Sequence, residues 1–164
     1  MTNRILPVMI ALVVGLPAAA PAQNTPNFSG TWKLNHVDPP FDMARGGAAG
    51  RGGGISGPYA ETTFSQAPDM LAISQSGSDI TVQIGSVKAV FTLDNKTVAR
   101  PEGDVNALKT RAHWDGARLH LHFKQGMNWG RDILAIDGGT LTLVRDLESG
   151  GQSTTRTLTY TKAS

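Results

Sequence analysis

Three of the chain's four histidines lie close together, at His113, His120 and His122. His120 and His122 are separated by one residue, so on a β-strand both imidazoles project from the same face. Neutral imidazoles are good ligands for Zn²⁺, Cu²⁺ or Ni²⁺, and neighbouring arginine and lysine side chains disfavour the protonated form near pH 7. His120 and His122 are therefore candidate metal ligands.

The turn between the histidine-bearing segments decides which residues accompany them. A two-residue turn at Asp115-Gly116 pairs each histidine with a basic residue: His113 with Arg118, Arg111 with His120, and Lys109 with His122. Because burying unpaired cations is costly, we expect His120 and His122 to be exposed to solvent. In this interpretation no carboxylate of the hairpin supplies a third ligand, so a solvated basic strip is expected and a metal site is the alternative.

A second group of chemically capable residues comes from the last part of the chain. Gly138-Gly139 and Gly150-Gly151 are signals for two-residue turns. The registers that they set place Asp132, Arg145 and Arg156 in one row on an otherwise apolar face, which Tyr160 shares. Two guanidiniums and one carboxylate leave one excess positive charge on that face.

Short strands are the elements that must position both groups. After residue 60 the chain alternates apolar and polar residues in short segments rich in Thr, Val, Ile and Leu, separated by Gly, Asn and Asp. This pattern, with turn signals also at Ser76-Gly77 and Asp115-Gly116, predicts antiparallel strands. We count about eight to nine strands and no helix, which predicts an all-β, antiparallel, up-and-down β-barrel.

The first residues predict a secretory signal peptide. A basic start containing Arg4 is followed by an apolar run and by Ala20-Pro21-Ala22, which fits a cleavage site. The signal would span residues 1–22 and the barrel domain residues 23–164, with no later apolar span to hold the chain in a membrane. We therefore expect a periplasmic or secreted protein.

The composition excludes several functional classes. The chain has no cysteine, which excludes a lipid-modified cysteine anchor, disulfides and thiolate metal sites. Its 15 basic and 13 acidic residues nearly balance, so nucleic-acid binding is not implied. None of the common catalytic motifs is present, and we expect no enzymatic activity. The oligomeric state is left open.

Residues 44–58 are rich in glycine and poor in apolar side chains, which predicts a flexible loop. The loop contains a formal G-x-G-x-x-G motif from Gly52 to Gly57. No strand precedes it and Pro58 follows it, so a dinucleotide site is not predicted. No cofactor is expected.

Residues 28–35, FSGTWKLN, resemble the first strand of the calycins, the group of lipocalins and fatty-acid-binding proteins that carry G-x-W at this point. The motif is Gly30-Thr31-Trp32 here. The opening F-S-G-T-W and the later W-D-G at 114–116 are most similar to bacterial secreted lipocalin-like proteins. The resemblance implies a lipocalin-like barrel that binds a small hydrophobic or amphipathic molecule. Fatty-acid-binding proteins have two lid helices after strand one, where this chain has its glycine-rich segment.

Because an unpaired inward arginine is costly to desolvate, the charged row has three alternative interpretations. The row is hydrated at an open barrel end, or one arginine stacks on Trp32 as the late-strand arginine of lipocalins does, or an acidic ligand completes the pairing. In the last case Arg145, Arg156 and Tyr160 bind the acidic head of the ligand. Fatty-acid-binding proteins use an R-x-Y pair for this purpose, whereas Arg156 and Tyr160 stand about 13 Å apart at strand rise. A structural barrel with a filled interior is the alternative function.

Overall fold

Ten antiparallel strands form one sheet in the computed structural model, which describes residues 25–40, 67–104, 106–149 and 151–163. The strands are β1 Gly30–Asp38, β2 Met70–Ser76, β3 Asp79–Ile84, β4 Val87–Thr92, β5 Val98–Arg100, β6 Leu108–Asp115, β7 Arg118–Gln125, β8 Asn128–Asp137, β9 Thr140–Ser149 and β10 Gln152–Lys162. No helix occurs in these ranges. The all-β prediction is confirmed, and the strand count is slightly higher than expected because the three-residue β5 is too short to show an alternating pattern.

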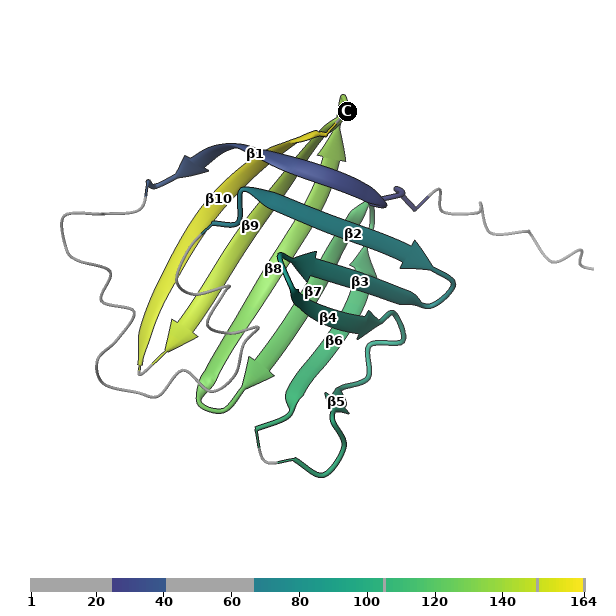
Figure 1. Cartoon of the computed structure of the whole chain (residues 1–164), viewed down its shortest axis with the longest axis vertical. Helices are drawn as coiled ribbons and strands as arrows, with labels where there is room; N and C mark the ends of the chain where they lie inside the picture. The colour runs from purple at the N-terminus through teal and green to yellow at the C-terminus, as the bar shows by residue number, and fades with distance from the viewer. Residues whose placement is uncertain (1–24, 41–66, 105, 150, 164) are drawn as a thin grey trace, which may run out of the picture.

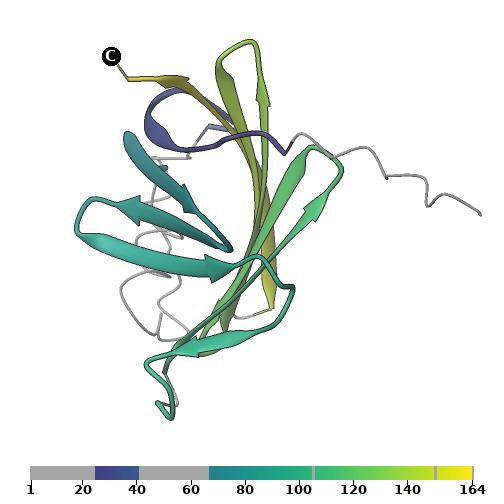
Figure 2. The same ribbon diagram turned by 90° about the vertical axis from the view of Figure 1, so that its right-hand side faces the viewer.

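The strands follow one another around a nearly closed barrel. Their order is β4-β3-β2-β1-β10-β9-β8-β7-β6-β5, so the pairing of β1 with β10 is the one ladder between strands distant in the chain within the described ranges. Figure 1 shows β2 to β4 crossing in front of the long strands β6 to β9, and Figure 2 shows the same two walls from the side. The interior lies between these walls.

A seam interrupts the barrel between β4 and β6. The two strands lie against each other, but no backbone ladder joins them in the described sheet. Side chains bridge the seam at the carbonyl oxygen of Val90, which accepts hydrogen bonds from Thr110 Oγ1 at 2.7 Å and from Arg100 Nη1 at 3.1 Å.

Two of the four predicted turns have the expected register, and two are displaced. The turns at Gly138-Gly139 and Gly150-Gly151 pair Asp137 with Thr140 and Ser149 with Gln152, as predicted. The other two turns consist of Gly77-Ser78 and Gly116-Ala117, so that the glycine stands first. Gly116 has a φ of 58°, which suits glycine at the first central position of a tight turn.

The displaced turns change cross-strand partners by two residues and leave the faces unchanged. In β6 and β7, Trp114, Ala112 and Thr110 pair with apolar partners and the histidines remain on the outer face. The buried apolar side chains of the inner face form the core: Phe28, Trp32, Leu71, Ile73, Ile80, Val82, Ile84, Ala89, Phe91, Ala112, Leu119, Leu121, Phe123, Leu134, Leu141, Leu143, Leu147, Leu158 and Tyr160. These side chains occupy much of the space between the two walls.

Close packing in the core explains one glycine. Gly130 on β8 pairs with Phe123 on β7, and a Cβ atom at position 130 would overlap the phenyl ring of Phe123. The ring therefore lies directly over the glycine backbone, and only hydrogen at this position leaves room for it.

The predicted signal peptide at 1–22 and the predicted glycine-rich loop at 44–58 lie outside the described residues. Within the described ranges, no helix has the length and hydropathy needed to cross a membrane.

Candidate functional site

The polar row predicted on the last three strands is present inside the barrel. Asp132 on β8 pairs with Arg145 on β9, and Arg145 pairs with Arg156 on β10. Arg145 donates from Nε and Nη2 to the two carboxylate oxygens of Asp132, each at 2.8 Å. Asp132 is 1% exposed and Arg145 is 3% exposed, so the ion pair is withdrawn from water. The carboxylate of Asp132 neutralises one guanidinium, so the three residues of the row together carry one net positive charge.

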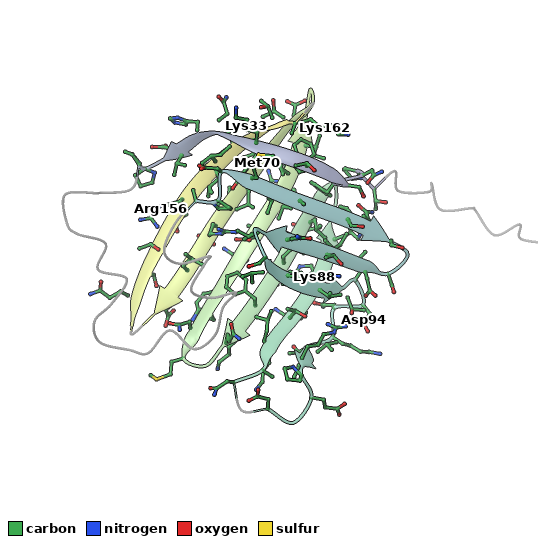
Figure 3. All side chains as sticks on the ribbon, viewed as in Figure 1. Lys33, Met70, Lys88, Asp94, Arg156 and Lys162 are labelled. Carbon is green, nitrogen blue, oxygen red and sulfur yellow. The ribbon has the colours of Figure 1, made fainter. Side chains whose placement is uncertain are left out.

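Arg156 and Tyr160 extend this polar region along β10. Arg156 is half-buried and Tyr160 is fully buried on the same inner face. Figure 3 shows Arg156 on β10 in the wall of the long strands. The hydroxyl oxygen of Tyr160 is buried and has no hydrogen-bond partner among the described residues. Burial raises the pKa of Tyr160, against an opposing effect of Arg145, so the hydroxyl stays protonated and can donate.

Trp32 on β1 is part of the buried core. Its indole nitrogen donates to the carbonyl oxygen of Phe28 at 3.0 Å, and the side chain is buried. The cation over its ring is Lys162, whose Nζ lies 6.0 Å from the ring centroid. Lys162 thus lies where the resemblance to lipocalins places a late-strand arginine, while the alternative in which Arg145 or Arg156 stacks on Trp32 stays a prediction. Figure 3 shows Lys162 near the end of β10, beside β1.

Gly30 supplies the space that this lysine uses. A Cβ atom at position 30 would lie 3.1 Å from Cε of Lys162, and Gly30 has a φ of 147°, which side-chain-bearing residues rarely adopt. The Gly30-Thr31-Trp32 motif therefore has a local physical reason: the glycine admits Lys162, and the lysine covers the tryptophan.

A cavity of about 590 Å³ opens along the seam. Its lining includes side chains from both walls and from the β5 region: Val87, Ala89, Arg100, Leu108, Thr110 and Gln125. The sequence patterns do not predict this site, because the cavity arises where β4 meets β6 and is partly lined by the short β5. The one local signal of β5 in the sequence is Pro101, which follows the isolated segment Val-Ala-Arg.

The three histidines form a cluster on the outer face of β6 and β7. The corrected turn places His113 directly opposite His120, with His122 on the diagonal. One ring nitrogen of each histidine lies within 4.8 Å of the other two. The cluster is half-buried, and the side chain of His120 is only 15% exposed, so the predicted solvent exposure of His120 and His122 is wrong. The rings stack on one another and thereby exclude water.

The surroundings of the cluster keep two of its imidazoles neutral. Burial, followed by the charge of Arg111, lowers the pKa of His122 to about 4. Burial also lowers the pKa of His120, while the carboxylate of Asp115 acts in the opposite direction. The predicted register did not reveal His113 as a third candidate ligand or Asp115 as a nearby carboxylate, whose Oδ2 lies 3.7 Å from Nε2 of His120. Placing Gly116 first in the turn would have found both.

Comparison with solved structures identifies similar barrels. No protein-family model and no curated protein sequence matches the chain. Echinococcus granulosus fatty-acid-binding protein 1 aligns with a TM-score of 0.53 at 14% identity, covering 84% of this chain and 98% of the other. A Schistosoma mansoni fatty acid binding protein in complex with arachidonic acid aligns at 0.53 and 15%, covering 84% and 96%. Zebrafish ileal bile acid-binding protein complexed with cholic acid aligns at 0.51 and 18%, covering 83% and 98%.

At these identities the comparison establishes the fold. The chain is a β-barrel of the kind that fatty-acid-binding proteins adopt, which confirms the calycin-like architecture. The finer similarity to bacterial secreted lipocalin-like proteins rests on the sequence motifs alone.

Proposed function

We propose that the chain is a secreted or periplasmic binding protein for one small hydrophobic or amphipathic molecule, without catalytic activity. The signal peptide is cleaved after Ala22, and the barrel acts in the compartment to which the chain is exported. The similarity of its opening F-S-G-T-W to bacterial secreted lipocalin-like proteins supports the same assignment.

The observation that carries the proposal is the buried hydroxyl of Tyr160. A hydroxyl without a partner in an apolar interior is unfavourable by roughly 1–3 kcal/mol, so an isolated barrel gains nothing from it. A ligand with a carboxylate or another acceptor would satisfy this hydroxyl. The guanidiniums of Arg145 and Arg156, further along the same inner face, are groups that bind an anionic head group by charge-assisted hydrogen bonds.

The seam supports the proposal in a second way. Its cavity of about 590 Å³ lies within the size range of small-molecule sites and combines apolar side chains with the buried polar residues Thr110 and Gln125. The apolar tail of a ligand could enter between β4 and β6, because no backbone ladder of the described sheet would have to break there.

The filled core favours a second candidate, a structural barrel with no ligand. The buried apolar side chains include the bulky residues Phe28, Trp32 and Tyr160. In this case the charged row is a structural closure. The two candidates differ in whether the interior takes up a molecule.

Native mass spectrometry of exported protein is the first test, with the prediction of a co-purified small molecule. Delipidated protein is then titrated with a fluorescent fatty acid, using Arg156→Leu and Tyr160→Phe, with Arg118→Leu on the outer surface as the matched control. We expect both inner variants to bind more weakly and the control to bind normally. No binding by the wild type to hydrophobic probes, together with an apo mass, would favour the structural barrel. Binding undiminished in both inner variants would remove the head-group role.

A further inference from the structure

The outer face of β6 and β7 carries a compact triangle of imidazoles, separate from the interior of the barrel. The ring centroids of His113 and His120 are 4.9 Å apart, those of His113 and His122 are 5.4 Å apart, and those of His120 and His122 are 6.4 Å apart. The backbone ladder between the two strands fixes the three Cα positions. The arrangement is therefore built by the sheet itself.

Each of the three rings has a buried nitrogen that lacks a partner. Nδ1 of His113, Nε2 of His120 and Nε2 of His122 are out of contact with solvent, and none makes a hydrogen bond within the described part of the chain. Leaving a buried polar atom unsatisfied is unfavourable. Three such atoms in one cluster are not explained by a solvated basic strip, in which water would hydrogen-bond to each ring.

We propose that His113, His120 and His122 form a binding site for a divalent transition metal ion, Zn²⁺ or Cu²⁺. A single ion would satisfy the three buried nitrogens at once, and imidazole suits both metals. Three protein ligands leave a further coordination position for water or an anion. A hollow of about 250 Å³, lined in part by His122, Arg111 and Lys124, lies beside the cluster.

Coordination requires the side chains to move slightly. With metal–nitrogen bonds of about 2.0–2.1 Å, the nitrogens of a tetrahedral site lie about 3.3 Å apart, so the present separations of up to 4.8 Å must shorten. The ion must also lie near the plane of each ring, whereas the rings of His113 and His122 are now within 14° of parallel. Both requirements therefore call for rotation of the side-chain torsions of the three histidines.

The charges around the cluster limit its affinity. Arg131 is neutralised by Asp146, with hydrogen bonds of 2.6 and 3.1 Å. Asp115 lies opposite Arg118 and 3.7 Å from Nε2 of His120, so it offsets one more guanidinium and is placed to hydrogen-bond a ligand. Arg111 remains as the excess positive charge. We therefore expect micromolar affinity, weaker than that of a site with a carboxylate ligand.

Calorimetric titration of the chain produced without an affinity tag tests the site. We expect one Zn²⁺ or Cu²⁺ per chain with micromolar affinity. His113→Ala, His120→Ala and His122→Ala should each weaken binding about tenfold or more, since even outer-shell partners contribute that much. His36→Ala is the matched control, because His36 is exposed on β1 and should leave binding unchanged.

The thermal midpoint of each variant in the presence of a chelator shows whether it folds. Electron paramagnetic resonance of Cu²⁺ bound to the wild type gives a readout that needs no variant, and we expect coupling to several imidazole nitrogens. The proposal is overturned if the wild type shows no saturable binding at submillimolar metal. It is also overturned if the copper signal shows only oxygen ligands, or if His113→Ala binds as tightly as the wild type.

Discussion

Arg145 and Asp132 face each other across β8 and β9 and are joined by two hydrogen bonds of 2.8 Å inside the barrel. Removal of one partner leaves an uncompensated charge in the core. We expect Asp132→Ala to lower the free energy of unfolding by about 3–5 kcal/mol. The double variant Asp132→Leu/Arg145→Leu should recover most of this loss, because neither charge then remains buried. Urea unfolding of the two variants measures both values, and a double variant less stable than the single one would contradict the expectation.

Tyr160→Phe should have opposite effects on stability and on binding. The substitution removes a buried hydroxyl that has no partner among the described residues, so the ligand-free barrel should become more stable by about 1 kcal/mol. The same variant should bind an acidic amphipathic probe less tightly. Thermal unfolding with and without probe separates the two effects. A destabilised Tyr160→Phe barrel would mean that the hydroxyl already serves the structure.

Gly130→Ala should destabilise the barrel for a purely steric reason. The new methyl group would overlap the ring of Phe123, which is buried and cannot leave the core. Overpacking of this kind is typically unfavourable by about 1–3 kcal/mol. The double variant Gly130→Ala/Phe123→Leu should recover part of the loss, since leucine vacates the space above residue 130. Chemical unfolding of the three proteins provides the comparison.

Asp146 should contribute stability that depends on pH. Burial raises the pKa of its carboxyl group, but hydrogen bonds from Thr155 and Arg131 and the charge of Arg131 outweigh burial, so the pKa is lowered overall. A lowered folded-state pKa means that the stabilisation is complete above the unfolded-state value of about 4 and is lost as the pH falls through the folded-state value.

We therefore expect Asp146→Asn to be less stable than the wild type at pH 7, by no more than about 1 kcal/mol because Arg131 is 41% exposed and screened by solvent. The difference should shrink in acid, and urea unfolding at pH 7 and near pH 3 measures it. A difference that grows in acid would contradict the sign.

Sequence patterns predicted those features of the barrel that depend on local turns. The double glycines 138–139 and 150–151 each allow a single two-residue turn frame, and the strand registers agree with it, so the row of Asp132, Arg145 and Arg156 follows. A single glycine allows two frames. At Asp115-Gly116 the predicted turn is displaced by one residue from the observed turn Gly116-Ala117. The predicted register therefore did not show that His113 lies opposite His120.

Features that depend on barrel closure could not be predicted in the same way. The seam cavity forms between strands that no turn connects. The side chain over Trp32 belongs to Lys162, which is far from Trp32 in the sequence. Alternation places a residue on a face, but it does not tell which distant strand lies beside it. How completely side chains fill the interior likewise depends on the distance between the two walls.

The ladder between β1 and β10 has a consequence for the order of folding. It joins Trp32 to Lys162, whereas the pairs from β6 to β10 connect strands that are neighbours in the chain. Strands that are neighbours in the chain can pair with little loss of loop entropy. Pairing β1 with β10 closes a loop that contains nearly all of the other strands, so it must wait until most of the chain is in place. We therefore expect hairpins of the long wall to gain hydrogen-exchange protection first, with β1 docking as the slow and final step that shuts the barrel.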